Sequence, residues 1–148
     1  MHLNYRQMIN SFQWLAEEVD FPGLDTKQIE DWIIRVARRH DRIVGEIAYI
    51  FCSDDKILDV NRRFLNHDYF TDIITFDDSR GKMISGDIFI SLDTVRSNAE
   101  AVGDSYDREL RRVVIHGILH LCGINDKGPG EREIMEANED EALAMLSA

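Results

Sequence analysis

Apolar residues recur at helical spacing in several segments of the chain. The most regular segment begins at Tyr106, where one face is apolar or glycine and the second half is apolar nearly all round. We therefore expect a central, buried helix over residues 106–121, ended by Gly123 in the left-handed conformation. The other predicted helices span residues 25–40, capped by Asp25, and residues 54–65, 92–102 and 131–146.

Three further segments are rich in the β-branched and aromatic residues that strands favour. They are "GEIAYIFCS" (45–53), "TDIITF" (71–76) and "SGDIFIS" (85–91). The last two flank a stretch whose Asp, Ser and Gly residues mark a turn, which predicts an antiparallel hairpin. We expect residues 1–148 to form a single α+β domain, in which a small mixed sheet with this hairpin packs against helices.

The segment "HGILHLCGIND" at residues 116–126 carries the candidate chemistry. His116 and His120 are four residues apart on the flank of the apolar stripe, so their imidazoles can converge on a metal ion. Gly123 lets the chain turn back, and Asp126 follows closely enough to supply a third ligand. Three ligands leave a fourth position for water or substrate, which is typical of catalytic metal sites.

A buried helix can also hold two histidines without a metal, with backbone carbonyl groups binding their ring nitrogens. Spacing alone leaves both interpretations open. The segment differs from the H-E-x-x-H signature of zinc peptidases, because Gly117 stands where the general-base glutamate would be. Peptidase chemistry of that type is therefore disfavoured.

The net charge of −11 argues against broad attraction to a polyanion, because nucleic-acid-binding proteins usually carry an excess of lysine and arginine. An RNA partner would have to meet a local basic face, and arginines do cluster at residues 35–42, 62–63 and 108–112. No segment has the apolar length of a membrane span. Cys52 and Cys122 lie in apolar segments and are expected to be thiols, in keeping with a cytoplasmic protein that has no membrane partner.

The segment "HGILHLCGIND" at residues 116–126 resembles the hallmark of the bacterial YbeY family, H-G-x-L-H-L-x-G-x-D-H. The segment "NHDYFTDIITF" is similar to the family's D-x-P-T-D-V-L-S-F, and "SGDIFISLDTVRSNAE" to its G-D-I-x-I-S-x-D strand and following helix. The resemblance implies a zinc-binding endoribonuclease that acts in ribosomal RNA maturation, with the small ribosomal subunit and its ribosomal proteins as partners. It implies one zinc ion, or another divalent metal, held by His116, His120 and Asp126.

Several positions depart from the family pattern, among them Asn125, which stands where the family carries the aspartate before its third histidine. Asp126 stands in place of a third histidine, and its negative charge should make the ion a weaker Lewis acid. Leu65 stands where the family tends to carry an arginine, and Arg62, one helical turn earlier, could take that role. Phe70 stands where proline is usual.

We expect the ion to polarise a phosphodiester oxygen, to activate a water molecule, or to do both during cleavage of single-stranded RNA. The predicted catalytic residues are His116, His120 and Arg62. The predicted substrate-binding residues are Arg62, Arg63, Thr71 and Asp72, for which a solvated helix face and a turn are the structural alternatives. Two other function classes stay open: a metal hydrolase of another substrate, and a non-catalytic ribosome assembly factor with a structural metal.

Overall fold

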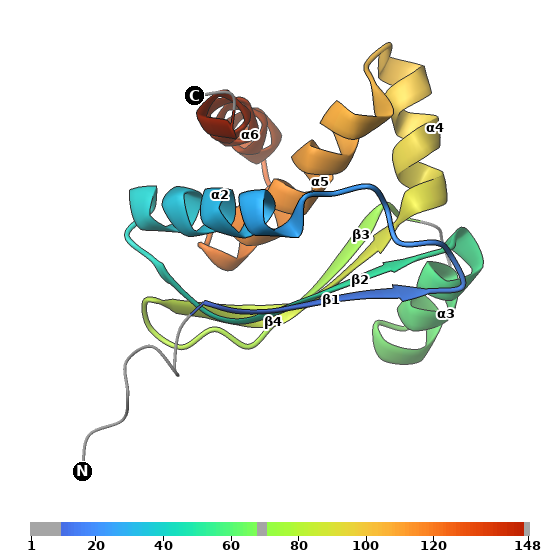
Figure 1. Ribbon diagram of the computed structural model, residues 1–148, viewed down its shortest axis with the longest axis horizontal. Helices are drawn as coiled ribbons and strands as arrows, with labels where there is room; N and C mark the ends of the chain where they lie inside the picture. Colours follow the sequence, from blue (N-terminus) through green and yellow to red (C-terminus); the bar gives the residue numbers. More distant parts are fainter. Residues whose placement is uncertain (1–9, 68–70, 147–148) are drawn as a thin grey trace.

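The computed structural model describes residues 10–67 and 71–146. Within them, four strands form a mixed sheet in the order β1-β2-β4-β3 (Figure 1). The strands are β1 (Ser11–Glu17), β2 (Ile43–Cys52), β3 (Ile73–Asp77) and β4 (Met83–Ser91). β1 and β4 run parallel to β2 on either side of it, and β3 pairs antiparallel with β4 at the edge of the sheet. The predicted α+β class, mixed sheet and hairpin are confirmed.

Helices cover the two faces of the sheet unequally (Figure 1). One face carries α2 (Thr26–Arg39), α4 (Leu92–Val102), α5 (Tyr106–Leu121) and α6 (Glu131–Leu146), and the other carries α3 (Asp54–Phe64). Each of these helices agrees with a predicted one to within one residue at either end. No helix in the part of the chain that the structure describes combines the length and apolarity that a bilayer crossing requires.

The main core is built around α5. Most side chains of this helix from Leu110 to Leu121 are buried. The hydroxyl of Tyr49 in β2 donates a hydrogen bond of 2.8 Å to the carbonyl oxygen of Val114, which ties α5 to the sheet. α2, α4, α6, β3 and β4 all contact α5. The prediction of a central, buried helix is therefore confirmed.

α3 forms a second, smaller apolar cluster on the opposite face of the sheet. Its buried members are Cys52, Ile57, Val60 and Ile74, with Phe76 and Phe89 packed against them. The hydroxyl of Ser53 caps the helix by accepting a hydrogen bond of 3.2 Å from the backbone N–H of Lys56. This packing fixes the last turn of α3 beside β3.

β1 is an element that the sequence analysis did not predict, since it assigned nothing before residue 25. Phe12 and Trp14 of β1 pack against the main core, and Trp14 donates a hydrogen bond of 2.7 Å to the carboxylate of Glu30 in α2. The strand pairs in parallel with β2 across the α2 crossover. Because no adjacent hairpin partner marks it, the short alternation of "SFQWL" is its main local signal.

Gly86 of β4 allows β3 and β4 to approach each other closely. A Cβ atom at residue 86 would overlap the carbonyl oxygen of Phe76 in β3, so Gly86→Ala must push the two strands apart. We expect this substitution to lower the free energy of unfolding by about 1–3 kcal/mol, the usual cost of overpacking, in urea unfolding followed by circular dichroism. Gly23→Ala is the control, because a Cβ atom at residue 23 meets no atom within 4 Å. Equal stability of the two variants would contradict the close contact.

Candidate functional site

The predicted metal ligands and two predicted substrate-binding residues line one cleft of about 380 Å³ beside β3. α5 contributes His116 and His120, the turn after α5 contributes Asp126, and the residues before β3 contribute Thr71 and Asp72. The other lining residues are Asn61, Leu65, His67, Ile73, Ile74, Thr75 and Lys127. The fold therefore brings the two motifs of the sequence analysis together in one place.

The position of the histidines depends on the close approach of α5 to the sheet. Gly117 follows His116 directly, and a Cβ atom there would lie 3.0 Å from Cδ1 of Ile88 and 3.2 Å from Cδ1 of Ile73. Both distances are shorter than ordinary van der Waals contact, so a side chain at residue 117 would require the side chains of Ile73 and Ile88, or α5 itself, to shift. Glycine at this position keeps the histidines beside β3.

The turn after α5 brings Asp126 back to the helix that precedes it. Gly123 has a φ of 97°, in the left-handed region that favours glycine, and its N–H donates a hydrogen bond of 2.9 Å to the carbonyl oxygen of His120. Arg42, before β2, donates from Nη2 to the carbonyl oxygen of Cys122 at 3.2 Å. The predicted role of Gly123 is confirmed, and Arg42 ties the end of α5 to a second segment of the chain.

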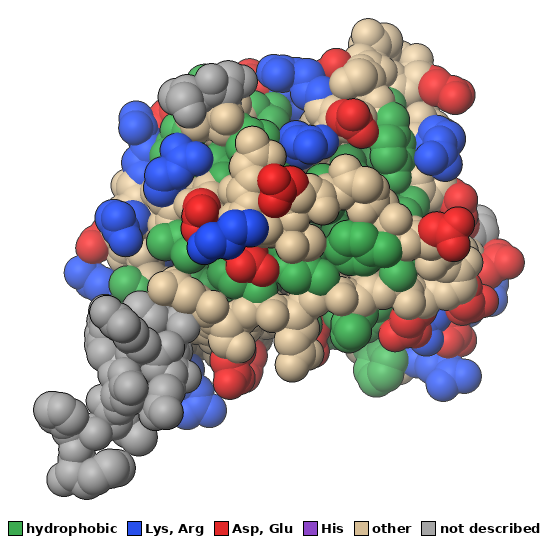
Figure 2. Space-filling view, in the orientation of Figure 1, with side chains coloured by type: hydrophobic (Ala, Val, Ile, Leu, Met, Phe, Trp, Pro, Cys, Tyr) green, Lys and Arg blue, Asp and Glu red, His purple; other side chains and the backbone are tan. Residues whose placement is uncertain are grey.

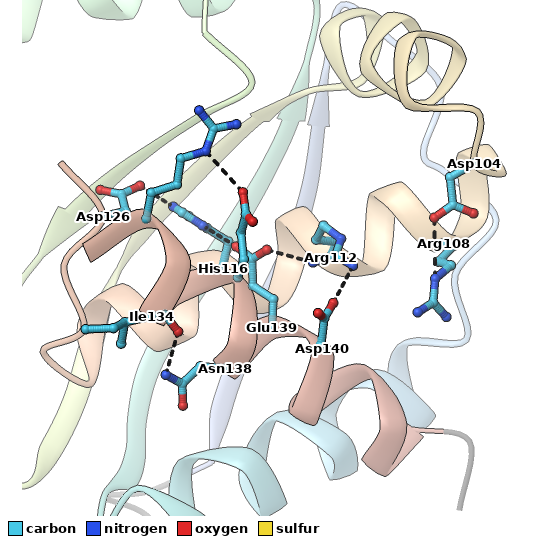
Figure 3. Close-up of polar contacts among 11 residues, drawn as sticks. Asp104, Arg108, Arg112, His116, Asp126, Ile134, Asn138, Glu139 and Asp140 are labelled. Carbon is cyan, nitrogen blue, oxygen red and sulfur yellow. Dashed lines mark hydrogen bonds and ion pairs between the residues drawn. The ribbon is translucent and has the colours of Figure 1, made fainter. Parts of the chain in front are cut away.

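Two carboxylates hold the ring of His116 (Figure 3). Its Nδ1 atom lies 2.7 Å from Oε2 of Glu139 in α6, and its Nε2 atom lies 3.2 Å from Oδ2 of Asp126. Arg112 donates to the same Glu139 carboxylate through Nη1 at 2.9 Å and to Asp140 through Nη2 at 2.7 Å. A side-chain carboxylate, rather than a backbone carbonyl group, thus binds Nδ1 of His116.

The contact with Glu139 orients the ring of His116. An ionised carboxylate only accepts hydrogen bonds, so Nδ1 donates its proton to Glu139 and Nε2 is directed at Asp126. Burial lowers the pKa of His116, but the hydrogen bond and charge of Glu139, together with the charges of Asp126 and Asp72, outweigh burial and raise that pKa. Burial also raises the pKa of Asp72, against the opposing effect of His116.

The chemistry of these side chains suits a divalent metal ion. Two zinc ligands with bonds of about 2.0–2.1 Å lie roughly 3.3–3.4 Å apart in tetrahedral geometry, and His116 Nε2 and Asp126 Oδ2 are 3.2 Å apart. A carboxylate behind the other ring nitrogen is the usual partner of a metal-binding histidine.

His120, the third predicted ligand, does not form a metal-binding group with His116 and Asp126 in the structure. Within residues 10–67 and 71–146, no three His, Cys, Asp or Glu side chains are placed together so that they could hold a metal ion. His120 lines the same cleft one helical turn from His116. The ligand set of His116, His120 and Asp126 therefore stays a prediction.

Glu139 and Lys127 are site residues that the sequence analysis missed. The side chain of Glu139 is only 8% exposed and lies on the buried side of α6 with Met135, Ala142 and Leu143. An acidic residue at an apolar position of a helix is the signal that could have found it, because buried carboxylates need partners. Lys127 brings a cation to the cleft directly after Asp126, and nothing in the local sequence marks it.

The two predicted arginines lie outside the lining of the cleft. Arg62 and Arg63 are exposed in the last turn of α3, and Nε of Arg63 lies 3.0 Å from a carboxylate oxygen of Asp59. Leu65 lines the cleft instead. Phe70, at the family's proline position, lies outside the described residues. On the face seen in Figure 2, acidic and basic side chains are interspersed, in keeping with a chain that has no large excess of basic residues.

Comparisons with known proteins identify the family of the chain. The family model described as Endoribonuclease YbeY matches residues 15–147. A Phocaeicola vulgatus protein of that name is 68% identical over 132 residues, 89% of this chain and 96% of that protein, and one from Bacteroides thetaiotaomicron is 64% identical over 130 residues, 88% and 95%. The solution structure of a Thermotoga maritima protein matches with a TM-score of 0.61 and 26% identity, covering 91% of this chain and 88% of that one. The resemblance read from the sequence is confirmed, and the chain belongs to the YbeY endoribonuclease family.

Proposed function

We propose that this chain is a metal-dependent endoribonuclease that cleaves single-stranded RNA during ribosomal RNA processing and maturation of the small ribosomal subunit, with one zinc ion as its metal. Membership of the YbeY family supports the endoribonuclease activity. One observation carries the metal-dependent part: Glu139 holds one ring nitrogen of His116 while the other faces Asp126 in a cleft that His120 shares. That arrangement places a nitrogen and an oxygen 3.2 Å apart, close enough to share one ion.

His116, His120 and Asp126 would hold the ion. When bound, the ion supplies Lewis-acid chemistry, since it stabilises negative charge on a phosphodiester and makes a water molecule more acidic. In a neutral His116 ring, the contact with Glu139 would keep the proton on Nδ1 and leave Nε2 to bind the ion. Arg112 holds the Glu139 carboxylate in place from the adjacent turn of α5.

Two other residues of the cleft act on the substrate. Lys127 carries an ammonium group that neutralises a phosphate of the bound strand. Asp72 has a carboxyl group whose pKa burial raises, which suits it to give a proton to the oxygen that leaves phosphorus. The new bond to phosphorus comes from water, which leaves one phosphate and one hydroxyl end, or from the 2′-hydroxyl of the RNA, which leaves a cyclic phosphate.

The proposal predicts that the protein purified without chelator and without a nickel column carries about one divalent ion per chain, because His116 and Asp126 lie at ligand spacing in a cleft that His120 also lines. Elemental analysis measures the ion, and cleavage of a single-stranded oligoribonucleotide measures activity. His120→Ala should lose both while its circular dichroism stays that of the wild type. Full activity at a metal content near zero would contradict the metal-dependent mechanism, and ribosome binding without any RNA cleavage would favour the assembly factor.

A second prediction concerns Glu139. Glu139→Gln removes the negative charge behind His116, so we expect the dissociation constant of the metal ion to rise about 10- to 100-fold, as for other carboxylates that support a metal-binding histidine. Competition with a chromophoric chelator measures this constant. Asp140→Asn is the matched control, because Asp140 also pairs with Arg112 but is far more exposed, at 65% against 8% for Glu139. Equal metal affinity of the two variants would show that Glu139 does not support the metal site.

A third prediction concerns Lys127. Lys127→Ala should raise KM severalfold and should lower the slope of log KM against log salt concentration by about 0.7, the share of one phosphate contact to single-stranded nucleic acid. Steady-state cleavage at several salt concentrations measures both. Lys82→Ala is the control, because Lys82 pairs with Asp41 in another part of the protein and does not line the cleft. A salt slope unchanged from the wild type would remove Lys127 from the substrate path.

A further inference from the structure

We propose that Phe64 is a base-stacking residue that binds an unpaired nucleotide beside the scissile phosphate and makes the enzyme prefer single-stranded RNA. This inference rests on the proposed function. Phe64 is the last residue of α3, and its side chain is 67% exposed. The next residue, Leu65, lines the cleft that contains His116 and is itself 40% exposed. An exposed aromatic ring is therefore carried by the chain neighbour of a residue that lines the cleft.

The ring of Phe64 is anchored although most of it is open to solvent. It packs edge-to-face against Phe76 of β3, with ring centroids 6.0 Å apart and an interplanar angle of 80°. Phe76 packs in the same way against Phe89 of β4, at 5.9 Å and 85°. Both partners belong to the apolar cluster beneath α3. Because the sheet already holds the ring, little side-chain freedom is lost when a base stacks on it.

The charges around Phe64 indicate the path of an RNA strand. Arg62 and Arg63 precede it in the last turn of α3, and the Arg63 side chain is 70% exposed in an i,i+4 pair with Asp59. Such exposed pairs contribute little to stability, so a phosphate can compete for the guanidinium group. Stacking on an aromatic ring beside cationic side chains is how proteins bind single strands without reading their sequence.

An acidic hollow on the sheet limits where the RNA strand can run beyond Phe64. A separate hollow of about 350 Å³ begins at Phe76 and continues over β1, β2 and β4. Its lining includes four acidic residues, Glu46, Asp77, Asp78 and Asp87. These carboxylates repel phosphates, so the strand is expected to pass from the cleft over Phe64 and the basic last turn of α3 rather than across the sheet.

A base can stack on Phe64 only when it is free of its own helical stack. In a duplex each base is already stacked and paired, and exposing one costs free energy. Phe64 therefore favours unpaired RNA over paired RNA. We expect the loss of its ring to raise KM for a single strand about tenfold, within the range known for base–aromatic stacking, and to change kcat much less.

The test uses the full chain with three substitutions of Phe64 and one single-stranded oligoribonucleotide that the wild type cleaves. Phe64→Ala and Phe64→Leu should both raise KM about tenfold and reduce the preference for this strand over the same strand annealed to its complement. Phe64→Leu keeps an apolar side chain packed on Phe76, so a raised KM in this variant reports the loss of the ring and not a loss of folding. Phe64→Trp should keep the wild-type KM. Phe21→Ala is the matched control, because Phe21 is 41% exposed and packs edge-to-face on Phe51, away from the cleft lining.

Fluorescence separates this proposal from the proposed function. A non-cleavable 2′-O-methyl RNA should quench the emission of the F64W variant beyond any change seen in the wild type, because a base stacked on indole quenches it. Wild-type cleavage with unchanged KM and unchanged strand preference in F64A and F64L would overturn the stacking role alone. A wild type that cleaves no RNA would overturn the proposed function, and the quenching experiment would still decide for or against Phe64.

Discussion

The arrangement of the site depends on one buried carboxylate. The side chain of Glu139 is almost fully removed from water, and an ionised group in that position is stable only when its charge and its hydrogen bonds are matched. Arg112 and His116 supply both partners. They lie four residues apart on α5, so they face the same way, and Glu139 can meet both only in one register of α6 along α5. The contact that docks α6 thus also sets the direction of the His116 ring.

Two glycines place the rest of the site relative to that contact. Gly117 allows α5 to lie closer to β3 and β4 than a side chain would allow without a shift of its neighbours, and Gly123 ends α5 so that the chain returns with Asp126. The cleft that results borders β3, an edge strand that pairs with β4 on its other side. The two glycines thus place the histidines and Asp126 beside the outermost strand of the sheet.

The sequence predicted what depends on local periodicity and spacing. The apolar stripe of residues 106–121 identified α5, the turn residues between two β-branched runs identified the hairpin, and one helical turn placed both histidines on the cleft. Contacts between elements were beyond that reasoning. The partner of His116 lies 23 residues away on another helix, and β1 pairs with a strand beyond a whole crossover helix. Helical spacing likewise could not tell that Arg62 and Arg63 lie outside the cleft lining, and their role in binding the substrate stays a prediction.

The departures from the family pattern at Asp126 and Leu65 both make the cleft less positive, and Lys127 compensates part of that change. In the proposed site, a doubly charged ion beside Asp126 retains a net charge of about +1, whereas three neutral imidazoles would leave +2. Leu65 lines the cleft where the family tends to carry an arginine, so the lining has one cation fewer. Lys127, next to Asp126 in the chain, returns one positive charge to the same cleft. For a chain with a net charge of −11, this local charge matters more than the overall one, since an RNA strand is repelled at long range and must be held by a few contacts at short range.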